Sequence, residues 1–144
     1  MGEMARLPSI DAVERIALQA KSDARGTLVV GEAGRQVPFA MQRFFAVTGA
    51  PAGETRGGHA HKALQQLLVC LNGTVRVRYD DGERDGTAVL GSPDEALLIP
   101  PGIWAEQVYG DTDTVLLVLC DAPYDEADYL RDYDAFVTYR RGPA

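Results

Sequence analysis

Apolar and polar residues alternate along much of the chain, in short runs separated by Gly, Pro, Asn and Asp. The clearest run is 74–79, in which Val75, Val77 and Tyr79 alternate with polar residues and so direct one face of a strand toward a core. Other short runs rich in strand-forming residues occupy 15–19, 27–31, 42–48, 67–71, 87–90, 96–99, 104–109 and 114–120. Many short strands at this spacing predict an all-β protein, either a β-sandwich or a barrel.

Turn and helix signals connect these runs. An Asn-Gly pair at 72–73 favours a two-residue turn, which predicts that 67–71 and 74–79 form a hairpin. Asp-Asp-Gly at 80–82 turns the chain again. A single short helix is predicted at 126–133, where three apolar residues lie three positions apart.

The predicted elements fit one domain. A chain of 144 residues is long enough to bury a sizeable core. It shows no internal repeat and no convincing linker. We therefore divide it into a leader at 1–14, a single domain at 15–138 and a C-terminal tail at 139–144.

Composition narrows the classes of function. Apolar residues make up 46% of the chain and charged residues 24%, as is typical of soluble globular proteins. The formal net charge of −7 argues against a nucleic-acid surface, which needs clustered Lys and Arg. No apolar run could span a membrane and no signal peptide is recognisable, so we expect a cytoplasmic protein without membrane contact. Cys70 and Cys120 lie in apolar runs and are expected to be buried, reduced thiols.

The candidate chemistry centres on the stretch RGGHAHK at 56–62, which holds the only two histidines of the chain, His59 and His61. On an extended strand, residues two apart point the same way, so both imidazoles face one side. An imidazole titrates near ~6.5, and the pair therefore suits either metal binding or proton transfer at neutral pH.

The surroundings resemble the two sequence motifs of cupins, with ligands missing. Gly53, the two histidines, Gln66 and Gly73 follow the spacing of the first motif, with Gln66 where a glutamate usually stands. Pro-Pro-Gly at 100–102 gives the turn of the second motif, but Ala105 occupies its histidine position. Two histidines and a neutral amide are fewer good ligands than a catalytic zinc site uses, so we expect no metal and favour proton transfer.

Four longer stretches resemble the WxcM-like family of sugar 3,4-ketoisomerases, which act on nucleotide-linked 4-keto-6-deoxyhexoses. They are RGGHAHK, QQLLVCLNGTVRV, LLIPPGIWAE and DAPYDEADYLRDYDAF. Together with DARG at 23–26 and VPF at 37–39, ahead of Arg43, the resemblance spans about residues 15–136.

The resemblance implies a cupin jelly-roll, a β-sandwich or barrel with a short C-terminal helical segment, that works without a catalytic metal or other cofactor. It implies a homodimer in which N-terminal strands cross to the partner. It also implies a substrate such as dTDP-4-keto-6-deoxy-D-glucose, isomerised to a 3-keto sugar by proton transfer between C3 and C4 through an enediolate. Matching the family's paired histidines gives His59 and His61 as catalytic residues, with His59 as the working choice of base and His61 as proton donor or relay.

Four further residues are candidates for substrate binding. Arg43 and Arg56 are the cations best placed by strand order to meet a diphosphate or a developing oxyanion. Gln66 either hydrogen-bonds a sugar hydroxyl, holds a histidine tautomer or is a satisfied core residue. Trp104 either walls the pocket or belongs to the core. The acidic and aromatic run 124–133 is interpreted as a closing structural segment rather than a platform for nucleotide stacking.

Two departures from the family bear on a proton relay. Phe44 and Phe45 stand where relatives often have tyrosines, and Ala105 where they often have histidine, so these positions offer no hydroxyl or imidazole for a proton relay. Two other functions stay open besides the isomerase. One is a non-catalytic cupin that binds a nucleotide sugar or another small acid as a sensor or partner module. Another is a metal-dependent cupin enzyme, such as an oxygenase, that completes its site with an unexpected ligand.

Overall fold

The computed structural model describes residues 7–142, which are built mainly of antiparallel strands. The elements, in chain order, are η1 (Ile10–Ala12), β1 (Glu14–Ala17), β2 (Gln19–Asp23), β3 (Gly26–Val30), β4 (Arg43–Thr48), β5 (Thr55–His61), β6 (Gln66–Asn72), β7 (Val75–Asp80), β8 (Asp85–Leu90), β9 (Glu95–Ile99), β10 (Trp104–Tyr109), β11 (Val115–Cys120), η2 (Glu126–Asp128), β12 (Tyr129–Leu130) and α1 (Tyr133–Arg141).

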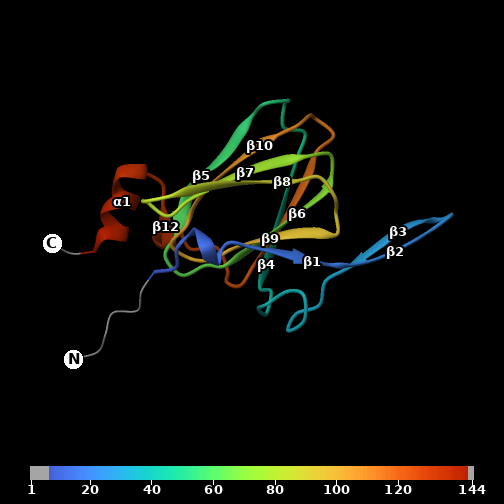
Figure 1. The fold of residues 1–144 in the computed structure, drawn as a ribbon, viewed down its shortest axis with the longest axis horizontal. Helices are drawn as coiled ribbons and strands as arrows, with labels where there is room; N and C mark the ends of the chain where they lie inside the picture. Colours follow the sequence, from blue (N-terminus) through green and yellow to red (C-terminus); the bar gives the residue numbers. More distant parts are fainter. Residues whose placement is uncertain (1–6, 143–144) are drawn as a thin grey trace.

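Two five-stranded sheets form the body of the molecule (Figure 1). The strand order is β1-β9-β6-β11-β4 in the first sheet and β12-β5-β10-β7-β8 in the second. Most neighbours are distant in sequence, as is typical of a jelly-roll, in which the chain passes back and forth between two sheets. The arrangement confirms the predicted all-β sandwich with a short C-terminal helix.

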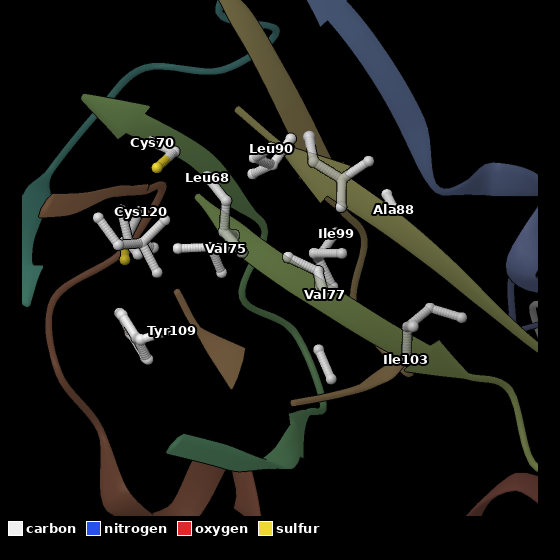
Figure 2. Close-up of a cluster of buried hydrophobic side chains, with 14 of the residues drawn as sticks. Leu68, Cys70, Val75, Val77, Ala88, Leu90, Ile99, Ile103, Tyr109 and Cys120 are labelled. Carbon is white, nitrogen blue, oxygen red and sulfur yellow. The ribbon is translucent and has the colours of Figure 1, made fainter. Parts of the chain in front are cut away.

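The core lies between the two sheets (Figure 2). On β7, Val75 and Val77 are fully buried while Arg76 is exposed, so the alternation in the sequence is the alternation of the strand. Each fully buried valine stabilises the fold by about 1.5–3 kcal/mol relative to an exposed one. The cluster includes Cys70 and Cys120, which are buried free thiols as expected.

The predicted hairpin between 67–71 and 74–79 is wrong, because β6 and β7 belong to different sheets. Strand β6 pairs with β9 and β11, whereas β7 pairs with β8 and β10. The Asn-Gly turn instead carries the chain from one sheet to the other, and Asn72 Nδ2 donates to the carbonyl oxygen of Asp113 at 2.8 Å. Strand β7 instead forms a hairpin with β8, at the predicted turn 80–82.

The physical reason lies in the two faces of β6. Leu68 and Cys70 pack into the core between the sheets, whereas Leu67 and Val69 pack on the other face in a cluster with Phe39. Apolar residues on both faces are typical of a central strand that is covered from both sides, and not of a half-exposed hairpin strand.

The C-terminal helix lies further along the chain than predicted. Segment 126–133 forms η2 and β12, and α1 begins at Tyr133, where the Asp132 side chain accepts a hydrogen bond from the Ala135 backbone N–H at 2.9 Å. Such an N-cap is a stronger start signal than apolar spacing alone. Phe136 is fully buried and anchors the helix. No helix within residues 7–142 has the length and apolar character needed to cross a membrane.

The domain boundaries stay predictions, although contacts reach across them. Arg140, in the predicted tail, donates to the carbonyl oxygen of Pro8, in the predicted leader, at 2.7 Å. Helix α1 continues to Arg141, past the predicted end of the domain at residue 138. Residues 1–6 of the leader and 143–144 of the tail lie outside the described residues.

Strands β2 and β3 form a separate two-stranded ribbon that points away from the sheets, at the end opposite to α1 (Figure 1). All of β2 is exposed, and Leu28 of β3 keeps 62% of its surface open. An isolated two-stranded hairpin is marginally stable in water. The ribbon therefore gains little stability from its own chain.

Candidate active site

Strand β5 presents the two histidines to the space between the sheets. Ala60, which stands between them, points the opposite way and packs with Trp104 and Phe136. His59 and His61 therefore share the inner face of the strand, as the alternation predicts. Their ring centroids are 5.0 Å apart, with an interplanar angle of 85°.

His61 is held by a carboxylate from a distant part of the chain. Its Nδ1 lies 3.1 Å from Oδ2 of Asp128, the residue before β12, and β12 pairs with β5 so that Tyr129 stands opposite His61. The His61 residue is 5% exposed. Its Nε2 is buried and has no hydrogen-bond partner among the described residues. One ring nitrogen is thus held by a carboxylate, while the other has a hydrogen-bonding capacity that the described residues do not use.

Both histidines are neutral at neutral pH. Burial lowers the pKa of His59 to about 4, with a smaller contribution from the neighbouring His61. Burial also lowers the pKa of His61, although the hydrogen bond to Asp128 acts in the opposite direction. A neutral imidazole carries one N–H donor and one lone pair, so each ring can accept or donate a proton.

Tyr129 packs against both imidazoles. Its ring centroid lies 5.0 Å from that of His59 and 4.3 Å from that of His61. Arg131 packs on Tyr129, with its Cζ 4.1 Å from the ring centroid, and donates two hydrogen bonds to the carboxylate of Glu126. The hydrogen bond from Arg131 lowers the pKa of Glu126 to about 2. Together, residues 126–131, which include η2 and β12, form a brace beside the histidines.

Arg43, at the start of β4, lines the same cavity as His61, a space of about 210 Å³ whose walls also include Asp128 and Tyr129. Arg43 Nη2 lies 3.7 Å from Sγ of Cys120, and Arg43 Nε is buried without a hydrogen-bond partner among the described residues. A buried donor without a partner costs free energy, which a bound anion would offset.

A smaller cavity of about 90 Å³ lies on the His59 side, and its walls include His59, Arg56, Gln66 and Phe45. Gln66 Nε2 lies 3.9 Å from Sγ of Cys120, the thiol that also contacts the arginine of the larger cavity. The two cavities together bring five of the six predicted site residues into one region, with the two imidazoles between them.

Trp104 does not join this group. Its ring centroid lies 5.3 Å from that of Tyr133 and 5.6 Å from that of Phe136, beneath α1. Its Nε1 donates to Oε1 of Glu106 at 3.0 Å. This position supports the core interpretation of Trp104 and not the interpretation as a pocket wall.

The donor set of the site does not match a metal centre. Among residues 7–142, no three His, Cys, Asp or Glu side chains lie close enough together to hold a metal ion. Ala105 pairs with His59 from the neighbouring strand, at the position where the second cupin motif supplies a ligand. The site instead contains two imidazoles, one carboxylate that is hydrogen-bonded to an imidazole, and two guanidinium groups.

Sequence reasoning missed Asp128 and Tyr129 as parts of the site. Both belong to the run 124–133, for which the sequence predicts a structural role only. Asp128 is 67 residues from His61 in the chain, and no local pattern marks so distant a contact. The one signal in the sequence is that this run is among the four stretches of family resemblance.

Proteins similar to this chain include sugar ketoisomerases. The family described as FdtA, WxcM-like, C-terminal, matches residues 11–141. A TDP-4-oxo-6-deoxy-alpha-D-glucose-3,4-oxoisomerase from Aneurinibacillus thermoaerophilus is 43% identical over 117 residues, which cover 81% of this chain and 84% of that protein.

Solved structures give the same family. The sugar 3,4-ketoisomerase QdtA from Thermoanaerobacterium thermosaccharolyticum, in complex with TDP, has a TM-score of 0.87 at 35% identity, covering 90% of this chain and 94% of that one. A 3,4-ketoisomerase from Helicobacter canadensis has a TM-score of 0.87 at 32% identity, covering 90% of this chain and 98% of that one. This chain, with its cupin jelly-roll, therefore belongs to the FdtA, or WxcM-like, family.

Proposed function

We propose that this protein is an isomerase, a nucleotide-sugar 3,4-ketoisomerase that converts TDP-4-keto-6-deoxy-D-glucose to a TDP-3-keto-6-deoxyhexose. Relatives that are named 3,4-oxoisomerase or 3,4-ketoisomerase match most of the chain. The observation that carries the proposal is the pair of neutral imidazoles on one strand face, His59 and His61, 5.0 Å apart and lining two adjacent cavities.

The isomerisation needs proton transfers at two adjacent carbons. In a 4-keto sugar the carbonyl acidifies the hydrogen on C3, and a neutral imidazole can remove it to leave an enediolate. Delivery of a proton to C4, with transfer of the hydroxyl proton from O3 to O4, gives the 3-keto sugar. A well-placed general acid or base contributes about 10²–10⁴-fold to the rate. In the working assignment His59 is the base at C3 and His61 is the donor or relay.

Arg43 and Arg56 are the proposed partners of negative charge. The enediolate carries negative charge, which fixed hydrogen-bond donors can stabilise. Arg43 lines the same cavity as His61, and its buried Nε has no partner among the described residues, so it is the proposed donor. Arg56 lies at the exposed mouth of the smaller cavity, a position suited to a diphosphate. Gln66 is the proposed hydrogen-bond partner of a sugar hydroxyl.

The proposed reaction uses no metal and no other cofactor. Its support is the donor set, which offers proton carriers and cations but no cluster of three metal-binding side chains within residues 7–142. We expect enzyme treated with a chelator and then dialysed to keep its full activity. Activity that disappears and returns with iron, manganese or zinc would identify a metal-dependent cupin enzyme instead.

The proposed assembly is a homodimer in which β2 and β3 add to the partner. The support is the exposed ribbon, with Leu28 open to solvent, which would gain stability by pairing with a second copy. Light scattering should give twice the mass of the chain. Deletion of 19–30 should reduce it to the mass of one chain, whereas a dimer that survives this deletion would contradict strand exchange.

The reaction is tested by NMR of TDP-4-keto-6-deoxyglucose incubated with the protein in D₂O. We expect a 3-keto product and deuterium at the exchanged carbon. Tight binding of the nucleotide sugar with neither exchange nor product would identify a non-catalytic binding protein. The configuration at C4 of the product follows from the same spectra.

A further inference from the structure

We propose that Asp128 is a positioning residue that fixes the tautomer of His61, with the ring proton on Nδ1, so that Nε2 enters the reaction as a proton acceptor. Of the two roles assigned to His61 above, donor or relay, this selects the relay, which accepts a proton before it passes one on. The catalytic consequence rests on the proposed function, whereas the tautomer itself does not.

The carboxylate of Asp128 is surrounded by N–H donors. Oδ1 accepts the Ala63 backbone N–H at 2.8 Å, and Oδ2 accepts the Leu64 backbone N–H at 3.3 Å. The Asp128 carbonyl oxygen accepts the Lys62 backbone N–H at 2.9 Å. The chain that directly follows His61 thus wraps around this one residue and fixes its position.

An ionised carboxylate can only accept hydrogen bonds. The contact of 3.1 Å between Asp128 Oδ2 and His61 Nδ1 is therefore a hydrogen bond only when Nδ1 carries the proton. A neutral ring has one ring proton, so Nε2 is then left with its lone pair. This atom is one of the few buried polar side-chain atoms of the described chain that lack a partner.

The position of His61 matches an acceptor role. Arg43, whose Nε also lacks a partner among the described residues, lines the same cavity. When Nε2 takes up a proton, the ring becomes cationic, and the adjacent carboxylate of Asp128 stabilises that charge. His59 has no carboxylate partner within residues 7–142, so the two rings differ in what holds them.

The substitution Asp128→Asn separates orientation from space filling. If the new amide oxygen stays where Oδ1 lies, it keeps the shorter bond, from Ala63, and the amide N–H₂ points at His61 Nδ1. The amide then donates to Nδ1, which moves the ring proton to Nε2. The variant has almost the same shape but offers the reaction a donor in place of an acceptor.

The first test reads the tautomer in the wild-type protein, without substrate, and uses a variant only to assign the signals. The chain has only two histidines, so a protein labelled with ¹⁵N-histidine shows four ring nitrogens, and His59→Asn assigns them. At neutral pH we expect the long-range ¹H–¹⁵N spectrum of the wild type to show Nδ1 of His61 protonated and Nε2 unprotonated. A wild-type His61 with its proton on Nε2 would overturn the proposal.

The second test uses Asp128→Asn beside Asp81→Asn. Asp81 is a buried carboxylate that also accepts backbone N–H bonds, from Ile10, Glu83 and Arg84, and it contacts no histidine. We expect Asp128→Asn to move the ring proton of His61 and to lower kcat by about 10²-fold or more, with the Kd for TDP unchanged. Asp81→Asn should reproduce any loss of Tm but leave the tautomer and kcat as they are.

Each remaining outcome is decisive. A folded Asp128→Asn protein that keeps its kcat, or one whose His61 keeps the wild-type tautomer while kcat falls, would contradict the positioning role. A wild-type protein with the expected tautomer that neither isomerises TDP-4-keto-6-deoxyglucose nor exchanges its hydrogen would support the structural part of the proposal and overturn the proposed function.

Discussion

His59 and His61 lie two residues apart on one strand face, yet the structure surrounds them differently. His61 is 5% exposed, bonds to Asp128 through one ring nitrogen and leaves the other without a partner among the described residues. His59 is half-buried and lines the smaller cavity with Arg56 and Gln66. The strand decides where the two rings point, and contacts from distant segments decide the state in which each ring is held.

The comparison teaches that one short motif can carry two unlike groups. Side chains alternate between the two faces of β5, so both imidazoles point in the same direction without any further interaction. The difference between them comes from β12, which brings Asp128 and Tyr129 to the His61 end. Four experiments test how far this difference reaches, beginning with the largest expected effect.

Replacing either histidine should have the largest effect. We expect His59→Asn and His61→Asn each to lower kcat by about 10²–10⁴-fold, because each removes a general acid or base of the proposed mechanism. NMR of the substrate in D₂O separates their roles: the variant that lacks the base at C3 should no longer exchange the C3 hydrogen. If either variant keeps wild-type activity, that histidine is not catalytic and the proposed pair fails.

Arg43→Lys tests the anion partner on the His61 side. A lysine keeps the positive charge but loses the planar set of donors, so we expect kcat to fall by roughly 10–10²-fold, as for the loss of part of an oxyanion site. The matched control is Arg76→Lys on the exposed face of β7, which should leave kcat unchanged. Equal kinetics of the two variants would exclude Arg43 from the site.

The stability of the protein should depend on pH through the two rings. The pKa of His59 is about 4 in the folded protein, below its usual 6.5, so the unfolded chain binds a proton that the folded chain does not. The free energy of unfolding is then highest above pH 6.5 and falls as the pH drops toward 4, by up to about 3 kcal/mol from this group.

Urea unfolding between pH 7 and 4.5 measures this dependence in the wild type and in each histidine variant. We expect His59→Asn to flatten the curve more than His61→Asn, because the hydrogen bond to Asp128 works against the effect of burial on the pKa of His61. Carboxylates that interact with neither ring are the same in all three proteins, so their contributions to the pH dependence cancel in the comparison. Identical slopes for the wild type and His59→Asn would contradict a neutral, buried His59.

The smallest effect is expected at the brace. Arg131 and Glu126 have side chains that are 53% and 58% exposed, and exposed ion pairs contribute little to stability. Arg131→Ala should therefore lower Tm by no more than a few degrees, comparable to the exposed pair lost in Arg25→Ala. A much larger loss, or a loss of activity similar to that of the histidine variants, would mean that the brace holds Tyr129 and both rings in place.

Much of the fold follows from local patterns. The alternation of Val75 and Val77 on β7 and the turn at 80–82 are properties of a few neighbouring residues, and both are confirmed. The partner of β6 is not a local property. The Asn-Gly signal at 72–73 describes how the backbone turns, but the choice between hairpin and crossing depends on what covers the second face of β6.

The candidate site divides in the same way. The shared direction of His59 and His61 follows from their spacing on a strand, and it is confirmed by the ring geometry. The contact of Asp128 with His61 depends on the pairing of β12 with β5, which only the folded chain brings about. Trp104 could not be assigned from sequence, because a buried tryptophan on either face of β10 fits the same pattern.

Ala60 is the residue whose importance is easiest to overlook. It is 1% exposed and lies between the two histidines, on the reverse of their strand, where it meets Trp104 and Phe136. A methyl group there lets α1 pack directly behind the two imidazole rings. A bulkier side chain there would push the helix away or twist the strand, so we expect Ala60 to accept few substitutions although it performs no chemistry of its own.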